Sequence, residues 1–285
     1  MSLSWFTYNL QNDLGVDELL SDLGHFLNTS DRSEAIASYQ DYSGLKQTGT
    51  WTSAESDRLF ERNCTCPDIS RSSSNKGHWE FGENEKQIIN LWSNVRGAND
   101  RFVANWMAGF KWWKQNNINL DFEFVESQRD CHVWATYQFI DGRNRTLAWS
   151  MLPVRHQRYR SRFLEQRYDP ADMNSDARSQ RVSAHEAGHA LGLDHIPSSV
   201  GVNLMNPFDN ASILGLMPGD TAEAVERYGV IEASPVPDPD PEVTLCDAQA
   251  TALRSAKKKL DSAFNIFEAA EDEYQKALAE IENQV

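Results

Sequence analysis

Apolar residues recur at helical spacing in the first quarter of the chain. One group consists of Leu19, Leu20, Leu23, Phe26 and Leu27, and a second of Ala35, Ile36 and Tyr39. Gly44 and a break at 48–50 end the second helix before a third, which covers about Ser53 to Glu61. The pattern therefore predicts a small helical bundle between Val16 and Arg62, followed by an exposed segment rich in Ser, Asn and Pro over 64–76.

The middle of the chain changes from helical to strand periodicity. Apolar residues at helical spacing predict helix from about Glu85 to Gln115. Alternation in 119–125, a β-rich run in 133–140 and a further run in 146–152 predict strands. Arg181–Leu191 again has the pattern of a helix. This order of helix, strands and helix predicts an α/β unit with its last motif on a helix.

The C-terminal part has a different pattern. Residues 234–242, SPVPDPDPE, form a proline- and acid-rich linker that cannot pack a core. Beyond the linker, Leu253 is the first of five large apolar residues that recur every seven positions. An alanine stands three positions after each of the first four. Such a repeat predicts a long helix that pairs with another helix. Residues 243–285 are therefore expected either to assemble a homo-oligomer or to fold back on their own chain.

The charge of the chain limits its possible partners. Its formal net charge is -15. This charge counts against non-specific binding to nucleic acid or to an anionic membrane surface, since both attract cationic patches. Five arginines between Arg155 and Arg167 are a local exception that could attract an acidic peptide, but we interpret them as the solvated face of a loop. No run of about 18 apolar residues occurs, so no membrane span is expected.

The segment from His185 to His195 has the spacing of a metal site. Residues four apart share one face of a helix, so His185 and His189 can present their imidazoles to the same ion. Gly192 has no Cβ and can take a left-handed turn that ends the helix and brings His195 round as a third ligand. Three neutral imidazoles leave a fourth position open, which is typical of a catalytic zinc site.

Glu186 directly follows the first of these histidines and is the candidate general base. Its carboxylate would point toward the open position and take a proton from the water that attacks a peptide carbonyl. The alternative interpretation is that these are surface histidines on an ordinary helix, but it leaves the third histidine at this spacing unexplained. The motif predicts a zinc endopeptidase that acts on proteins or peptides and uses one catalytic zinc ion.

This motif resembles the extended zinc-binding sequence of the metzincins. Residues 204–207, Leu-Met-Asn-Pro, are similar to the Met-turn beneath the metal in that class, which would make Met205 the apolar floor of the site. Leu147 and Ala148 lie in a segment similar to the upper edge strand of the matrixins, the matrix metalloproteinase family, whose backbone pairs with an extended substrate. The resemblance implies a twisted, mostly parallel sheet with an antiparallel edge strand and long helices.

The N-terminal part resembles the helical propeptide of the matrixins, which is also similar to peptidoglycan-binding repeats. The residues that carry this resemblance are Ala35, Ile36, Tyr39, Gln40, Gly44, Leu45, Thr48, Gly49 and Thr50. Cys64-Thr-Cys-Pro-Asp stands where that propeptide keeps its inhibitory Cys-Gly-Val-Pro-Asp segment. A thiolate is a strong zinc ligand, so Cys64 would occupy the position that water needs and keep the enzyme latent. The alternative is a disulfide between Cys64 or Cys66 and Cys131 or Cys246.

Three features depart from the matrixin pattern. Asn63 and Thr65 replace the Arg and Gly that flank the family's switch cysteine, which leaves Arg62 to substitute in the usual pairing with Asp. Trp149 stands where the family's edge strand carries a histidine for a structural zinc. Neither a His-x-Asp motif nor a glycine-rich calcium loop occurs between Pro153 and Arg178. The last two departures count against a second zinc ion or structural calcium ions.

These interpretations divide the chain into a helical propeptide with its switch segment (1–74), a metzincin catalytic domain (75–233), a linker (234–242) and a long helix (243–285). The leading hypothesis is a latent zinc endopeptidase. One alternative is a cell-wall-directed hydrolase with an N-terminal peptidoglycan-binding module, and another is a structural or assembly protein with a vestigial zinc site. The resemblance favours an extracellular or cell-surface location, although the N-terminus shows no secretory signal.

Overall fold

The computed structural model describes residues 10–62, 64, 66–69, 77–81, 87–95, 100–115, 118–143, 145–154, 157–158 and 163–230. The predicted linker, the heptad helix and Cys246 lie outside the described residues, as do Asn63 and Thr65. Within the described part of the chain, no helix is long and apolar enough to cross a membrane.

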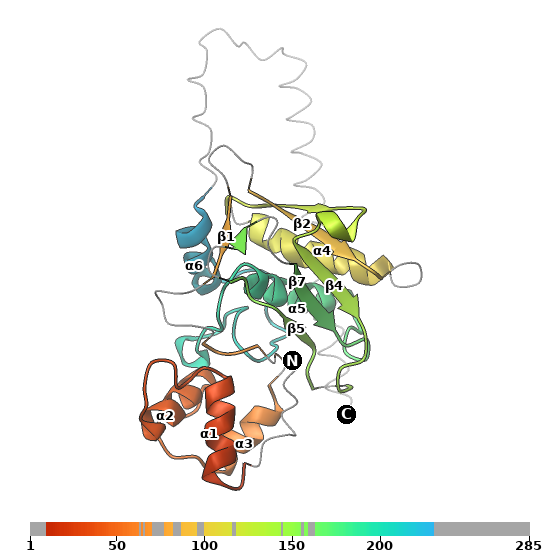
Figure 1. Ribbon diagram of the computed structural model, residues 1–285. Helices are drawn as coiled ribbons and strands as arrows, with labels where there is room; N and C mark the ends of the chain where they lie inside the picture. The colour runs from red at the N-terminus through yellow and green to blue at the C-terminus, as the bar shows by residue number, and fades with distance from the viewer. Residues whose placement is uncertain are drawn as a thin grey trace, which may run out of the picture. The chain divides into compact units, whose positions relative to one another are not determined.

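Three short helices lie near the N-terminus (Figure 1). They are α1 (Asp13–Asp22), α2 (Arg32–Tyr42) and α3 (Ser53–Phe60). Each begins where a polar side chain, that of Asn12, Asp31 or Thr52, accepts a hydrogen bond from a backbone N–H of the first turn. Their buried core consists of Val16, Leu19, Leu20, Leu23, Ala35, Ile36, Tyr39 and Leu59. The helices expected between Val16 and Arg62 are thus present.

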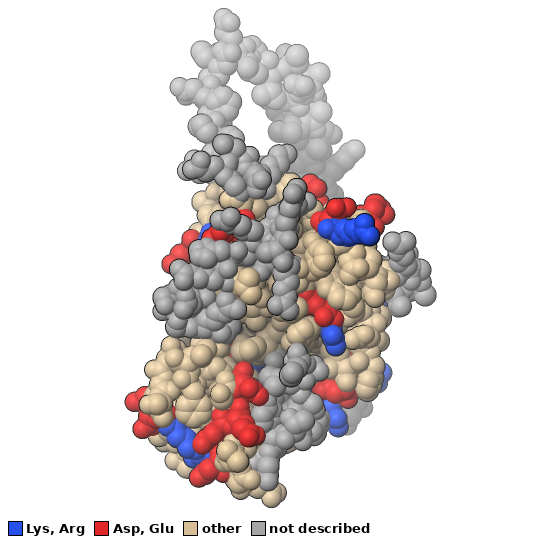
Figure 2. Space-filling view, viewed as in Figure 1, with Lys and Arg blue, Asp and Glu red and all other residues tan. Residues whose placement is uncertain are grey.

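The outer face of this helical group is acidic. Figure 2 shows acidic side chains gathered over the helix nearest the viewer, α1, whose exposed residues include Asp13, Glu18 and Asp22. Arg32 of α2 partly offsets this charge, because its guanidinium pairs with Asp17 at 2.6 Å and with Asp13 at 2.9 Å. Both pairs are solvent-accessible and contribute little stability.

A five-stranded sheet forms the centre of the larger part of the chain, in the order β3-β2-β4-β7-β5. The strands are β2 (Ile88–Ser93), β3 (Asp121–Phe124), β4 (Val133–Tyr137), β5 (Ala148–Ser150) and β7 (Leu164–Tyr168). Neighbouring strands are parallel except β5, which runs antiparallel to β7 at one edge. The mostly parallel sheet with an antiparallel edge strand is confirmed. A separate pair joins β1 (Trp79–Glu80) to β6 (Gln157–Arg158).

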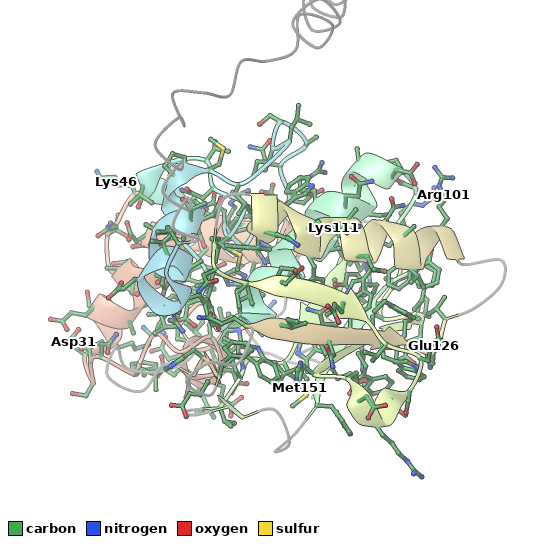
Figure 3. The ribbon with its side chains drawn as sticks, turned by 90° about the horizontal axis from the view of Figure 1, so that it is seen from above. Asp31, Lys46, Arg101, Lys111, Glu126 and Met151 are labelled. Carbon is green, nitrogen blue, oxygen red and sulfur yellow. The ribbon has the colours of Figure 1, made fainter. Side chains whose placement is uncertain are left out.

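Two long helices pack against each other beside this sheet. They are α4 (Asp100–Gln115), which carries Arg101 and Lys111 (Figure 3), and α5 (Asp176–Ala190). The indole Nε1–H of Trp113 in α4 donates to the carbonyl oxygen of Ala184 in α5 at 2.9 Å. Further along the chain, η4 (Gln128–Asp130), η5 (Ser198–Val200) and α6 (Pro218–Tyr228) complete the described elements. The sequence patterns did not predict α6.

The helix predicted from about Glu85 to Gln115 is wrong in its first part. Residues 88–93 form β2, in which Ile89, Leu91 and Ser93 are buried in alternation. The apolar residues of this run fit a helical period as well as a strand period over so few positions. Pairing with β3 on one side and β4 on the other decides the outcome, because it satisfies the backbone groups of β2 on both edges.

The arginine-rich run from 155 to 167, interpreted above as the solvated face of a loop, needs correction at its described end, residues 164–167. It contains most of β7, which lies between β4 and β5 in the sheet. Leu164, Gln166 and Tyr168 are buried, whereas Glu165 and Arg167 are partly exposed. Polar residues at alternate positions concealed the strand, because a buried glutamine is unusual unless its amide is hydrogen-bonded.

One buried carboxylate fixes the loop between β4 and β5. The backbone N–H groups of Ile140, Asp141 and Gly142 all donate to Oδ2 of Asp169 at 2.9 to 3.1 Å. Burial acts to raise the pKa of Asp169, but these backbone hydrogen bonds and one from Ala171 outweigh it and lower the pKa. The ionised carboxylate of Asp169 therefore holds this loop, which leads directly into the edge strand β5.

Candidate active site

Helix α5 and the turn that follows it bring three histidines together. His185 and His189 lie one turn apart on α5, which ends at Ala190. Gly192 has a φ of +89°, and a Cβ there would lie 2.1 Å from the carbonyl oxygen of Gly77, so only glycine fits. The turn carries the buried His195 back toward the helix, and the three Nε2 atoms lie 3.1 to 3.3 Å from one another.

The donor set of this cluster fits a zinc ion. Nδ1 of His185 lies 2.7 Å from the carbonyl oxygen of Leu204, and Nδ1 of His189 lies 2.8 Å from that of Leu193. A carbonyl oxygen only accepts, so both Nδ1 atoms carry the proton and both Nε2 lone pairs face the centre of the cluster. Zinc binds imidazole nitrogen at about 2.0–2.1 Å, and tetrahedral geometry then separates the ligand nitrogens by about 3.3 Å.

The protonation states of two of these histidines suit metal binding. Burial, followed by the neighbouring imidazoles, holds the pKa of His189 well below its ordinary value. Burial likewise lowers the pKa of His195 to about 3. Burial acts to lower the pKa of His185, but a hydrogen bond to Cys64 and the charge of Cys64 outweigh burial and raise that pKa. Neutral His189 and His195 supply the lone pairs that a metal ion requires.

The thiol of Cys64 completes the group. Its Sγ lies 3.5 Å from Nε2 of His189, and the sulfur and the three histidine nitrogens all lie within 4.8 Å of one another. A tetrahedral zinc with a sulfur ligand at about 2.3 Å would place sulfur and nitrogen about 3.6 Å apart. Cys64, Cys66 and Cys131 are free thiols. The disulfide alternative is thus wrong for a pairing of Cys64 or Cys66 with Cys131.

Arg62 holds the segment that carries Cys64. Its buried guanidinium donates to the carbonyl oxygens of Cys64 and Cys66, each at 2.8 Å. It also pairs with the carboxylate of Asp68 at 2.7 and 2.9 Å. The pairing that the matrixin resemblance assigns to an arginine next to the cysteine is therefore made by Arg62, one residue further away.

Asp68 connects this segment both to the histidine cluster and to the N-terminal helices. Its Oδ1 lies 2.9 Å from Nδ1 of His195, and its Oδ2 lies 3.0 Å from Nε2 of His25. The backbone N–H groups of Asp68 and Ile69 also donate to the carbonyl oxygen of Leu23. Burial acts to raise the pKa of Asp68, but Arg62 and then the two histidines outweigh it and hold the pKa well below its usual range.

The candidate base Glu186 lies against the sulfur of Cys64. Its side chain is buried, and one carboxylate oxygen lies within 4.8 Å of Sγ of Cys64 and of a ring nitrogen of His189. Burial, followed by the neighbouring Cys64 thiol, raises the pKa of Glu186 well above its ordinary value. A carboxyl group with a raised pKa beside a candidate metal centre suits proton transfer near neutral pH.

Met205 lies directly beneath the helix that carries the histidines. A Cβ on Gly188 of α5 would lie 2.4 Å from Sδ of Met205, so the methionine packs where only a glycine allows it. The buried carboxylate of Asp220 accepts hydrogen bonds from the backbone N–H groups of Leu204 and Met205, both at 2.9 Å. Because Leu204 in turn holds His185, Asp220 positions a candidate ligand indirectly.

Sequence reasoning missed Asp220, and it also missed Gln166. The Gln166 amide donates from Nε2 to the backbone oxygen of Glu186 at 2.7 Å, and its Oε1 accepts from Trp106 and Tyr168. Neither residue forms part of a short motif. The acid in the first turn of α6 and the polar residue in a strand were the only signals available.

The chain near Cys64 lies along the edge strand β5. Cys64 forms an isolated parallel bridge with Ala148, and the Cys66 thiol donates to the carbonyl oxygen of Ser150 at 3.3 Å. Leu147 and Ala148, expected to bind substrate, are both buried. Cys64 and Cys66 thus lie against the backbone that an added strand would use.

A small cavity, partly open to solvent, lies beside Cys64, His185 and Glu186. Its apolar walls come from Leu147, Val182, Leu204, Pro207 and Ile213. Arg181 also lines it, but its guanidinium binds the carboxylate of Asp209 through two hydrogen bonds of 2.6 and 3.0 Å. The guanidinium of Arg58 in α3 lies 3.6 Å from the ring centroid of Phe208, another lining residue. The N-terminal helices therefore contact the wall of this cavity.

Comparison with known proteins assigns the chain to a family. No curated protein matches the chain. The family model of the matrixins, a peptidase family, matches residues 78–229, from just before β1 to just after α6. The matched stretch contains all three histidines, Glu186 and Met205, and it excludes the N-terminal helices. Since it covers more than half of the 285 residues, the chain belongs to the matrixin family of metallopeptidases.

Proposed function

We propose that this matrixin is a zinc-dependent endopeptidase that its own N-terminal segment keeps latent. The observation that carries the proposal is the group of ligand atoms formed by Cys64, His185, His189 and His195, which all lie within 4.8 Å of one another, with a Glu186 carboxylate oxygen within 4.8 Å of the Cys64 sulfur. His185, His189 and His195 would hold the metal ion.

The chemistry assigned to the chain's own residues follows from this arrangement. When bound, zinc polarises a peptide carbonyl and makes water easier to deprotonate. Glu186 would accept the proton of the attacking water and deliver it to the departing amine. The backbone of Leu147 and Ala148 would pair with an extended peptide, and the apolar cavity would receive a side chain next to the scissile bond. We expect the substrate side chain in this cavity to be apolar, because the two charged residues that line it, Arg181 and Asp209, already pair with each other.

Latency would follow from the same contacts. Substrate would need the edge of β5 and the fourth metal position. Cys64 bridges to Ala148 of that strand, and its Sγ lies 3.5 Å from Nε2 of His189. Arg62 and Asp68 hold that segment closed, and His25 links it to the helices. This attachment favours an inhibitory role for the N-terminal helices over a separate peptidoglycan-binding module. Cleavage of the chain between the helices and β1 would release the segment.

The test is zinc content and hydrolysis of an unstructured protein by the full chain, before and after limited proteolysis that removes the N-terminal helices. We expect one zinc ion per chain in both forms and hydrolysis only after removal. The Cys64→Ser variant provides an active form in which no peptide bond has been cut. If both the processed chain and this variant bound zinc but cleaved no peptide, the endopeptidase proposal would be wrong.

A further inference from the structure

Cys66 is a second buried thiol in the candidate site, and the proposed reaction does not use it. Its Sγ lies 3.3 Å from the carbonyl oxygen of Ser150 and 4.0 Å from Oε2 of Glu186. Its backbone N–H donates to Sγ of Cys64 at 3.4 Å. The ligand atoms of Cys64, Cys66, Glu186 and His189 all lie within 4.8 Å of one another, which sets an upper limit on the distance between the two sulfurs.

We propose that Cys64 and Cys66 form a site of reversible oxidation, at which a peroxide converts the two thiols to a Cys64–Cys66 disulfide and so activates the uncut chain. The inference rests on the proposed function, because it assumes that Cys64 is the inhibitory ligand. It assigns to Cys66 the role of the resolving cysteine.

The chemistry balances with one peroxide molecule per disulfide. The Cys64 thiolate attacks one oxygen of hydrogen peroxide, which breaks the O–O bond and gives a sulfenic acid and hydroxide. Cys66 then attacks the sulfenic sulfur, and the S–OH bond breaks as the disulfide forms. The hydroxide released from the S–OH group takes up the proton of the Cys66 thiol and leaves as water. The two sulfurs are oxidised by two electrons in total, and the peroxide is reduced to water and hydroxide.

The geometry supplies both access and a reason for activation. Cys64 lines the small cavity that is partly open to solvent, which gives a molecule as small as a peroxide a route to its sulfur. A disulfide bond of about 2.05 Å draws Sγ of Cys64 toward Cys66. In the reduced chain, Sγ of Cys64 lies 3.5 Å from Nε2 of His189, whereas Sγ of Cys66 lies beside Ser150 and Glu186. A disulfide sulfur also lacks the charge that makes a thiolate a strong ligand.

The sequence separation of the two cysteines accounts for reversibility. Only one residue lies between them, so the disulfide closes a short ring. Strained disulfides are reduced more readily than relaxed ones, and a thiol reductant should therefore restore the ligand. Cys131 lies at the end of η4 and belongs to neither candidate ligand group, so it serves as a matched control.

The experiment uses the zinc-loaded full chain, freed of reductant and treated with a small excess of hydrogen peroxide. Free thiols are then alkylated, and the cysteine pairing is mapped by mass spectrometry. We expect a Cys64–Cys66 linked peptide in an uncut chain and peptide hydrolysis raised to the rate of the Cys64→Ser variant. Dithiothreitol should return the chain to the latent rate. Cys131→Ser should behave as the unaltered chain does.

The Cys66→Ser variant separates this route from simple overoxidation. It has no resolving thiol, so any activation by peroxide should come from further oxidation of Cys64 and should persist in dithiothreitol. If Cys64 and Cys66 in the unaltered chain remained free or paired elsewhere, or if dithiothreitol did not restore latency, the inference would be overturned. A Cys64→Ser variant without raised activity would instead contradict the proposed latency, even if the disulfide were mapped.

Discussion

The carboxylate of Asp68 lies 2.9 Å from Nδ1 of His195, so a residue of the N-terminal segment holds a histidine of the candidate metal site. Nη2 of Arg62 also lies 3.0 Å from this Nδ1, but a proton on Nδ1 would satisfy the carboxylate, which only accepts, and would leave the Nε2 lone pair facing the cluster. The same carboxylate pairs with Arg62, which holds the backbone around Cys64. One side chain therefore connects docking of the segment to the orientation of a candidate ligand.

Replacement of this carboxylate should weaken latency. In Asp68→Asn, the buried guanidinium of Arg62 loses its counter-charge, and breaking such a pair costs about 3–5 kcal/mol. We expect peptide hydrolysis by the uncut chain and faster hydrogen exchange in residues 64–69. The matched control is Asp17→Asn, which breaks an accessible pair with Arg32 that is worth about 0–1 kcal/mol. Equal hydrolysis by the two variants would show that the Arg62 pairing does not maintain latency.

Loss of the candidate base should separate metal binding from catalysis. Glu186→Gln, made in the Cys64→Ser background, should keep its zinc and lose roughly 10²–10⁴ in kcat, because the proton acceptor is gone while the histidines remain. His195→Ala should instead lose metal. Zinc content by atomic absorption and peptide hydrolysis distinguish the two. If the Glu186 variant retained most of the activity of its parent, another carboxylate would have to be the base.

The two cysteines of the segment should differ in their effect on latency. Cys64→Ser replaces the soft ligand by a hydroxyl of similar size, so water should enter and hydrolysis should begin without removal of the helices. Cys66→Ser should stay latent, since a serine can still donate to the carbonyl oxygen of Ser150. Hydrolysis of a fluorogenic peptide by uncut chains measures both. Activation by Cys66→Ser alone would identify Cys66 as the inhibitory ligand.

Stability should fall in mild acid because of His132. This buried side chain accepts a hydrogen bond from the Asn90 N–H at 2.7 Å, and burial lowers the pKa of His132 to about 4. The unfolded histidine, with a pKa near 6.5, takes up a proton first as the pH falls. The contribution of His132 is thus fully present above about pH 6.5, and it decreases by at most about 3 kcal/mol between pH 6.5 and pH 4.

Urea unfolding of the unaltered chain and of His132→Gln at pH 7 and pH 5 measures this effect. Glutamine offers the Asn90 N–H an acceptor but does not titrate. We therefore expect the difference in unfolding free energy between the two chains to shift in favour of the variant at pH 5. The metal site is the same in both chains and cancels in the comparison. A pH-independent difference would mean that His132 titrates normally in the folded chain.

Removal of residues 243–285 should leave catalysis unchanged, because the matched family stretch ends at residue 229. An isolated helix in water would leave the apolar heptad positions of the tail exposed, so we expect the tail to pack against another helix. If that helix belongs to a second subunit, the truncated chain should have a lower native mass. Sedimentation of the full and truncated chains decides between the two outcomes. A full chain that sediments as a monomer would favour a tail folded back on its own chain.

The histidine cluster was predictable because its geometry is local. Two of the histidines lie one turn apart on a single helix, and Gly192 takes the left-handed turn that its missing Cβ allows. The eleven consecutive residues from His185 to His195 contain all of this information. In the same way, the apolar positions within α2 and α3 were sufficient to predict those two helices. Helical periodicity and a glycine turn require no partner from elsewhere in the chain.

What only the tertiary structure decided depends on partners distant in sequence. The run 88–93 is a strand because β3 and β4 pair with it, and β7 is a central strand because Gln166 finds hydrogen-bond partners inside the core. Asp68 and His195 are 127 residues apart, and no local pattern relates them. A sequence pattern records which side chains one helix or strand can present, whereas the packing of separate segments decides which buried charges and amides meet.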